Sequence, residues 1–167
     1  DECASYGLKK LKNVEIPENS DLQTIGKNAF FGTHIETLSI PSNLIELKNG
    51  WCNNTQHLNN INVSPNNRHF KSFEDKFILG KFSIESDNFD VLVFCIRKIK
   101  KITIPSFIKI IGPSAFSSCL IYSILIHSQI THIFDEAFLF CKKLRRIEIP
   151  TNSDLKMIDD YAFSNSS

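Results

Sequence analysis

The chain has 167 residues, which fits one domain, and its 42% content of hydrophobic residues is enough to bury a core. Nineteen basic and 18 acidic residues leave a formal net charge of +1, so no overall charge favours nucleic acid or an anionic membrane as a partner. No apolar run approaches the ~20 residues that span a bilayer, which argues against direct membrane insertion of this segment.

A short string recurs along the chain. It consists of an apolar residue, two variable residues, a second apolar residue, one variable residue and a third apolar residue, often followed by Pro. The third apolar residues are spaced by 22 to 24 positions, except that Val63 and Ile104 are 41 apart and so flank a degenerate unit. Self-similarity at one period is the signature of a repeat architecture. The copies begin at Leu11, Ile35, Leu58, Ile99, Ile121 and Leu144.

A second string follows in most units and consists of an Ile with Ala and Phe four and five positions later. It covers residues 25–30, 111–116, 133–138 and 158–163, and a weaker copy has Gly50-Trp51 in place of Ala-Phe. In two units a Cys follows the Phe by three positions. Two independent strings at one period predict a solenoid of about six units.

The physics of one unit predicts where each string lies. Alternate residues of a strand face opposite sides, so Val14 and Ile16 point into the core while Glu15 points outward. Stacked copies should form a parallel sheet on the concave face, and each Ala-Phe string a turn or 3-10 segment on the convex side, with its Phe in the core. We therefore expect an α/β fold class and one continuous domain over residues 1–167.

Residues 66–95 form the irregular unit. This stretch is rich in Phe and holds two apolar runs, 77–79 and 91–94, separated by Gly80 and the polar residues 86–88. Apolar runs of this length on either side of turn residues predict a β-hairpin-like elaboration in the middle of the solenoid.

The strings resemble the BspA-like (Treponema pallidum-type) leucine-rich repeats, whose pattern is L-x-x-I-x-I-P followed by I-G-x-x-A-F-x-x-C. Residues 99–119 and 143–163 match it closely, and residues 63–79 are similar to the longer variant repeat of that family. Departures are local: Gly50-Trp51, no Pro after Ile126 and no Cys after Phe30. The Ile- and Asn-rich composition is similar to that of protist members, such as the trichomonad set.

The resemblance implies a leucine-rich-repeat solenoid that acts as a non-catalytic protein-protein interaction module. Such members are associated with adhesion at the cell surface or outside the cell, to host-cell or extracellular-matrix proteins. The resemblance supplies no cofactor and no catalytic residue. The alternative is an intracellular leucine-rich-repeat scaffold without an adhesive role.

The outward strand positions define the candidate binding surface, because solenoids bind on the concave sheet or its rim. This surface is polar and nearly without aromatic anchors, so we expect a modest contact strengthened by many copies. Its residues are Asn13, Glu15, Thr37, Ser39, Asn60, Asn62, Lys101, Thr103, Ser123, Leu125, Arg146 and Glu148.

Residues that could carry chemistry are few, and no catalytic or metal-binding motif occurs. His127 and His132 are the closest histidines in sequence, and we interpret them as surface or turn residues. A catalytic pocket in the elaboration, lined by His69, Glu74 and Asp75, is the least favoured alternative. The adjacent acidic pairs 135–136 and 159–160 occupy equivalent positions, which favours polar turn residues over a catalytic dyad.

The five cysteines are odd in number and contain no C-x-x-C, so their spacing specifies neither a disulfide framework nor a zinc site. Cys119 and Cys141 stand at equivalent repeat positions. We expect them to stack in the core as free thiols, and a disulfide between neighbouring units is the alternative. Cys3 and Cys52 are interpreted as capping-region thiols.

Three N-x-[ST] sequons occur, at Asn53, Asn62 and Asn165, and Asn53 is the favoured acceptor because it is expected in a loop. Asn62 lies in a predicted strand, so a glycan there would project from the concave face. The chain starts without Met and stops before a further strand, and no polar capping repeat is evident. We therefore expect a fragment of a longer protein or an end-to-end homo-oligomer.

Overall fold

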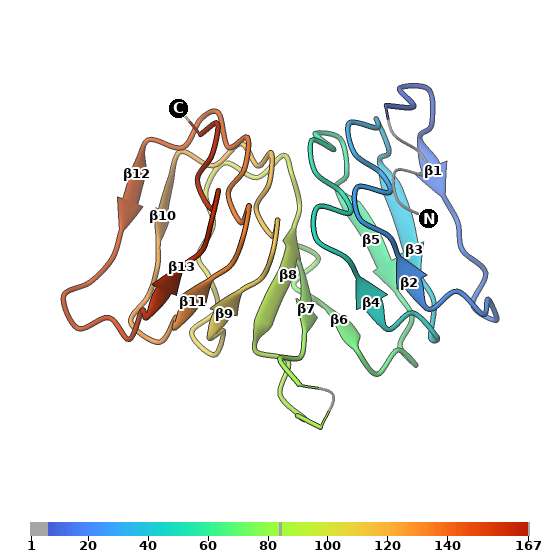
Figure 1. Cartoon of the computed structure of the whole chain (residues 1–167). Helices are drawn as coiled ribbons and strands as arrows, with labels where there is room; N and C mark the ends of the chain where they lie inside the picture. The colour runs from blue at the N-terminus through green and yellow to red at the C-terminus, as the bar shows by residue number, and fades with distance from the viewer. Residues whose placement is uncertain (1–6, 84, 167) are drawn as a thin grey trace.

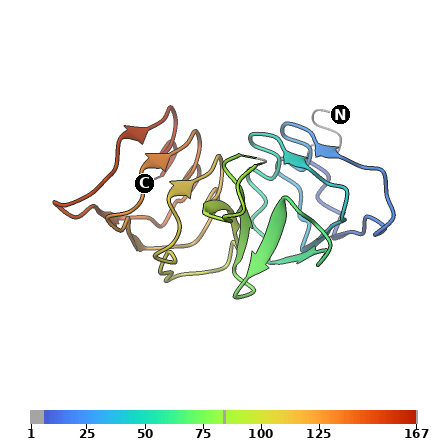
Figure 2. The ribbon, with the colours of Figure 1, turned by 90° about the horizontal axis from the view of Figure 1, so that it is seen from below.

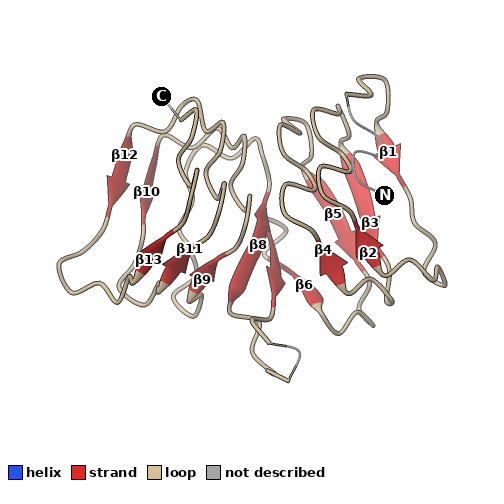
Figure 3. Cartoon of the chain, in the orientation of Figure 1, coloured by secondary structure: helices blue, strands red, loops and turns tan. Residues whose placement is uncertain are grey.

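In the computed structural model, which describes residues 7–83 and 85–166, each repeat unit forms one turn of a solenoid (Figure 1). We number the units one to six from the first residues of their first strings. The described residues form 13 strands and no helix (Figure 3). The predicted solenoid is confirmed, but the α/β label is loose, because the Ala-Phe strings form hydrogen-bonded turns in place of any helical segment.

The first strings form a row of parallel strands that is interrupted in the middle. β1 (Asn13–Val14), β3 (Thr37–Ile40) and β5 (Asn60–Val63) make one sheet, and β10 (Ser123–Leu125) and β12 (Arg146–Glu148) make another. The registers join equivalent residues of neighbouring units. Ile and Val form these strands because branched side chains suit a pleated surface with one buried face.

The first string of unit four, residues 99–104, is not a strand, which corrects the sequence prediction. Its start is held on both sides, since Arg97 N–H donates to Leu58 O and Tyr122 N–H donates to Lys100 O, each over 3.3 Å. Beyond that point the segment pairs neither with β5 nor with β10, so the ladder of the first row is interrupted in unit four.

A second row of strands, which the sequence did not predict, lies one residue ahead of the turns that the Ala-Phe strings form. These strands have only two residues each and pair in parallel with the equivalents in neighbouring units. They are too short to show a period of their own. The row consists of β2 (Thr24–Ile25), β4 (Glu46–Leu47), β9 (Ile110–Ile111), β11 (His132–Ile133) and β13 (Met157–Ile158).

The predicted hairpin-like elaboration is confirmed and has one strand more than expected. β6 (Phe70–Phe73), β7 (Phe77–Gly80) and β8 (Val91–Cys95) form an antiparallel meander, and β8 then pairs in parallel with β9. Glu74 and Asp75 have φ values of 52° and 51°, the positive values of a type I′ turn, and with Lys76 they form the connection between β6 and β7. The meander thus joins the second row of strands and separates the two sheets of the first row (Figure 1).

Each Ala-Phe turn begins with a residue whose φ lies in the left-handed region. This residue shows which positions of the different turns are equivalent. Gly50, with φ of 71°, is equivalent to Asn28, with φ of 54°. The N–H of Phe30 donates to Trp51 O over 2.8 Å, as the ladder of these turns requires. Trp51-Cys52, and not Gly50-Trp51, therefore replaces Ala-Phe in unit two. The remaining turns begin at Ser114, Glu136 and Tyr161, with φ of 54° to 57°.

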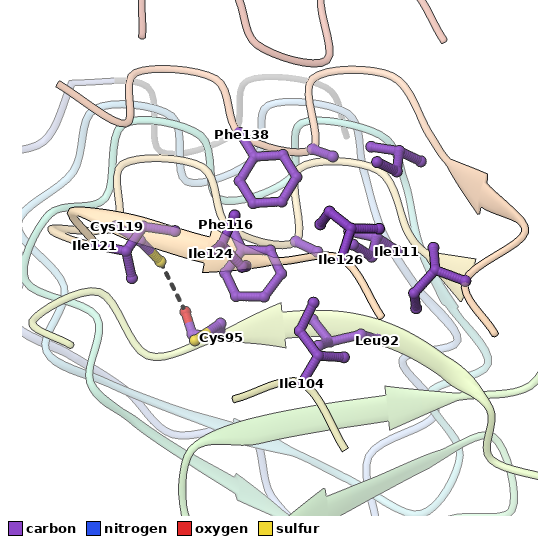
Figure 4. Packing of buried hydrophobic residues seen from close by; sticks show 14 of the residues in the cluster. Leu92, Cys95, Ile104, Ile111, Phe116, Cys119, Ile121, Ile124, Ile126 and Phe138 are labelled. Carbon is purple, nitrogen blue, oxygen red and sulfur yellow. Dashed lines mark hydrogen bonds between the residues drawn. The ribbon is translucent and has the colours of Figure 1, made fainter. Parts of the chain in front are cut away.

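The core consists of two apolar clusters, one in each half of the stack, and the meander contributes to both. Phe138 lies between Phe116 and Phe163, with ring centroids 4.9 and 5.0 Å away and nearly parallel planes. Figure 4 shows Phe116 and Phe138 above Cys95, with the inward Ile residues beside them. The prediction that the Phe of each unit fills the core is confirmed for Phe116 and Phe138, whereas Phe163 is only partly buried against them.

The two halves of the stack are inclined to each other about the meander (Figure 2). The turn of unit two reaches the turn of unit five: Asn49 Nδ2 donates to Asp135 Oδ2 and Asn53 Nδ2 to Glu136 Oε2, each over 2.6 Å. The acidic pair 135–136 therefore has a structural role between non-neighbouring units, beyond the polar turn role predicted for it.

Candidate functional site

The residues predicted to bind a partner all lie at outward positions, and we call this set the first-strand face. None of its members is buried, whereas the alternating positions Leu38, Ile40, Ile124 and Ile126 are. The interrupted row of strands divides the face into two parts. One part lies on β1, β3 and β5 and the other on β10 and β12, with Lys101 and Thr103 on the irregular segment between them.

Side chains of the first-strand face contact one another both between units and within one unit. Thr37 Oγ1 of unit two donates to Asn13 Oδ1 of unit one over 2.8 Å, and within β12 Arg146 Nε lies 3.1 Å from Glu148 Oε1. Large apolar side chains are nearly absent, and Leu125 is the one member of the predicted set that exposes an aliphatic side chain. The face therefore offers hydrogen-bonding groups and single charges for contact with a partner.

Several hollows adjoin the elaboration, and two of them hold apolar and aromatic side chains that the first-strand face lacks. The first is a groove of about 290 Å³ along β5, walled by Asn59–Val63 on one side and by Ser72 and Asp75–Ile78 on the other. The second, of about 510 Å³, is lined by Phe73, Phe89 and Phe107. The first-strand face lacks aromatic side chains. They gather instead on the meander and on the loop after residues 99–104.

Two histidines that are distant in sequence come together in the structure. The rings of His34 and His57 have centroids 4.9 Å apart, because these residues are 23 positions apart and stand at equivalent positions of units one and two. Burial, followed by the charge of His34, lowers the pKa of His57. The 23-residue spacing of this pair equals the repeat period, so the pair could have been predicted from the sequence. His127 and His132 do not contact each other, because His127 contacts Pro105 O and His132 contacts Thr131 Oγ1.

Two cysteines occupy core positions that rings fill elsewhere in the stack. The N–H of Cys95 donates to Ala115 O over 2.9 Å, as the N–H of Phe116 donates to Ala137 O over 2.7 Å, so Cys95 and Phe116 are equivalent. Cys52 stands at the same position in unit two, which corrects its interpretation as a capping-region thiol. A sulfhydryl is much smaller than a phenyl ring, so this part of the core has room for another side chain.

Arg97 fills that room and is completely buried. Its Nη2 lies 2.9 Å from Cys52 Sγ, its Nη1 donates to Ala115 O over 3.1 Å, and its guanidinium carbon lies 4.3 Å from the centroid of the Phe94 ring. No carboxylate among the described residues forms an ion pair with it. Because guanidinium groups stay protonated in proteins, its charge is balanced by a carbonyl oxygen, sulfur and a π face.

The four cysteines in the described part of the chain are free and buried, and they include Cys119 and Cys141. The expectation of stacked thiols is therefore confirmed over the disulfide alternative. Burial raises the pKa of Cys52 to about 11, although the guanidinium of Arg97 opposes this shift. Cys3 lies outside the described residues.

The residues of the catalytic alternative are not brought together. Asp75 lines the groove along β5, while His69 lines a separate hollow beside Ile45 and Gly80. Glu74 pairs with Lys76 over 3.1 Å at the exposed hairpin turn. Over residues 7–83 and 85–166, no three His, Cys, Asp or Glu side chains are grouped so that they could hold a metal ion.

The sequons differ in their surroundings. Asn53 is buried and its Nδ2 donates to Glu136, so in the folded chain a glycan on this nitrogen would displace that hydrogen bond. The burial of Asn53 argues against this sequon in the folded chain, and occupancy of the three sequons stays a prediction. Asn62 and Asn165 are exposed, and Asn62 belongs to the first-strand face.

The fold and the repeat register define the class of the protein, which is a leucine-rich-repeat solenoid. The family model described as "BspA type Leucine rich repeat region (6 copies)" matches residues 1–94 and 71–167. The chain therefore belongs to the BspA-type leucine-rich-repeat family. Repeats of this family are a protein-interaction fold and are generally non-catalytic.

Solved structures of similar fold come from bacteria. A leucine-rich repeat protein from Eubacterium ventriosum is 25% identical, with a TM-score of 0.74 over 88% of this chain and 38% of its own. A leucine rich cell surface protein from Faecalibacterium prausnitzii is 20% identical, with a TM-score of 0.65 over 83% of this chain and 41% of its own. The chain thus spans well under half of each, and no curated protein matches it. Among the described residues, no helix is long and apolar enough to cross a membrane.

Proposed function

We propose that the chain is a cell-surface or extracellular adhesion module that binds host-cell or extracellular-matrix proteins through the first-strand face or its rim. The observation that carries the proposal is the exposed, polar surface presented in register by neighbouring units. The similar fold of the Faecalibacterium prausnitzii cell surface protein supports the location. A protist origin, indicated by the composition, belongs to the same proposal.

The contact is weak at each copy and gains strength from multivalency. Exposed polar groups and single ion pairs contribute little individually, since a surface ion pair is worth ~0–1 kcal/mol. Display of many copies raises the apparent affinity without any new contact. End-to-end association of two copies is part of this proposal, and the exposed Ile149 and Ile158 of unit six support it.

The test displays the folded chain on beads and measures retention on host cells and on immobilised matrix proteins. Reversing two charges of the face, with Lys101→Glu and Arg146→Glu, should reduce retention several-fold without changing the melting temperature. Lys27→Glu with Lys156→Glu, which reverses two exposed charges outside the face, is the matched control. Equal retention of both double variants would move the binding site off the first-strand face.

An intracellular scaffold without adhesive role is the second candidate, and the free, buried thiols favour it. Mass analysis of protein from the native host separates the two candidates. Glycan at Asn62 or Asn165 supports the surface location, whereas material without glycan and without retention on cells supports the scaffold. A glycan at Asn62 would also cover the part of the face on β5.

A further inference from the structure

The strand β5 has an open edge inside the solenoid. In its pairing with β3, the N–H groups of Asn60 and Ser64 donate to Glu36 O and Ile40 O. Successive residues of a strand direct their N–H and C=O groups to opposite sides, so those of Ile61 and Val63 point away from β3. Among the described residues no strand pairs with β5 on that side, and these groups have no hydrogen-bond partner.

A groove lies along this open edge. Its floor and far wall include Ile78, Phe94 and Ile96, and β5 contributes its own residues to the near wall. The apolar groups are those of the core, and the amide side chains of Asn60 and Asn62 are exposed at the mouth. An added strand with alternating apolar and polar residues would continue the pattern of β5, with its apolar residues on the inner side.

The segment that follows Ile96 of the groove lining is rich in lysine. Lys98, Lys100 and Lys101 are exposed and form no ion pair within the described residues. Lys98 begins the segment that diverges from β5, where its N–H donates to Asn59 Oδ1 over 2.9 Å. Asp75 is the single carboxylate in the groove lining. The excess of unpaired lysines complements an acidic partner.

We infer that the groove along β5 binds an extended acidic peptide segment of a partner protein, which pairs with Ile61 and Val63 as an added strand. The inference rests on the proposed function only in requiring a protein partner. It places part of the contact at the interruption of the first-strand row, where backbone groups are free, and it continues the first-strand face on β5. Backbone pairing supplies affinity, and the lysines supply selectivity for acidic sequences.

The test uses a fluorescein-labelled heptapeptide that alternates Asp and Val, with fluorescence anisotropy as the readout. Val63→Pro removes the free-edge N–H and no bond to β3, since proline is tolerated where the N–H of an edge strand faces outward. Val63→Ala keeps that N–H and is the matched control. We expect Val63→Pro to weaken binding about tenfold relative to Val63→Ala, the effect of losing one backbone hydrogen bond.

Charge and backbone pairing are tested separately. Lys98→Glu with Lys100→Glu should weaken binding several-fold, whereas Lys9→Glu with Lys10→Glu should not. The same peptide with N-methylated valines, and a peptide that alternates Lys and Val, should bind at least about tenfold more weakly. Amide signals of Ile61 and Val63 should shift in NMR spectra on addition of the Asp and Val peptide.

Absence of binding by the wild-type chain overturns the inference, as does equal binding by Val63→Pro and Val63→Ala or by the N-methylated peptide. These results do not depend on adhesion. A chain that binds the peptide but is not retained on cells contradicts only the proposed function. Retention on cells without peptide binding contradicts only the groove.

Discussion

Asn53 in unit two donates a hydrogen bond to Glu136 in unit five over 2.6 Å, although the two residues are 83 positions apart. Both lie in turns of the same kind, and Asn49 makes a parallel contact with Asp135. The inclination of the two halves about the meander brings these turns together (Figure 2). A contact between units that are not neighbours therefore holds the halves in one arrangement.

Glu136→Asn should destabilise the chain through the loss of this contact. Asn tolerates the left-handed conformation of position 136 but is one methylene shorter, so the buried Asn53 amide loses its acceptor. We expect the free energy of unfolding to fall by ~1–3 kcal/mol, measured by denaturant unfolding. Glu136→Gln keeps the length and an acceptor oxygen and should retain most of the stability. Equal losses in both variants would contradict the role of the hydrogen bond.

Phe138→Ala should lower the melting temperature sharply. Its ring is completely buried between those of Phe116 and Phe163, so its removal leaves a cavity and costs ~3–5 kcal/mol. Phe82→Ala is the control, because Phe82 is 70% exposed and should change stability by less than ~0.5 kcal/mol. Similar melting temperatures for the two variants would mean that Phe138 does not fill the core.

Arg97→Met should leave the stability unchanged or raise it. Methionine fills much of the same volume and removes a buried charge that has no carboxylate partner, and such replacements are often neutral or stabilising by ~1–4 kcal/mol. Arg97→Ala should instead cost ~2–5 kcal/mol, because it leaves a cavity beside Cys52. Denaturant unfolding of both variants measures the difference. A loss for Arg97→Met as large as for Arg97→Ala would show that the guanidinium contacts themselves stabilise the core.

Acidification should destabilise the chain through His57. The folded-state pKa of His57 is lowered from its ordinary value of 6.5, so the unfolded chain takes up the proton first as pH falls. The contribution of His57 to stability is therefore complete above that value and is lost as pH falls through 6.5 toward the lower folded-state pKa. The free energy of unfolding, measured from pH 7.5 to 5, should fall more steeply for the wild type than for His57→Gln.

The control for this experiment is His127→Gln, which removes a histidine that lies outside the pair. Its pH profile should keep the wild-type slope that His57→Gln loses. If the free energy of unfolding of the wild type and of His57→Gln fell equally steeply with pH, protonation of His57 would not be linked to folding.

The first strings could be predicted from sequence because their apolar residues alternate, and the inward positions of Leu38 and Ile124 follow directly. Strands of two residues, such as β2 and β11, could not be predicted from the sequence, because two residues are too few to show an alternating pattern. The non-strand course of residues 99–104 also escaped prediction, since the string of apolar residues is intact there and yet forms no ladder with either neighbouring unit.

The candidate site was predictable in part. Outward positions of the first-strand face follow from the strand period, whereas the open edge of β5 depends on what the irregular unit does in space. Arg97 stands next to Lys98 and Lys100 in a sequence that indicates a solvated basic cluster, yet it is buried. Arg97 is buried because Cys52 and Cys95 stand where other units have a Phe ring, which leaves room for its side chain. This equivalence becomes visible only when the turns of the units are aligned in the structure.

The contact between units two and five changes how the solenoid should respond to stress. A straight stack is quasi-one-dimensional, because each repeat touches only its neighbours and can fray from an end while the rest survives. Here the units from two to five form a closed circuit of contacts, through the backbone in one direction and through Asn53 and Glu136 in the other. Loosening any one of these units strains the link, so we expect units two to five to melt as one cooperative block, with fraying confined to units one and six.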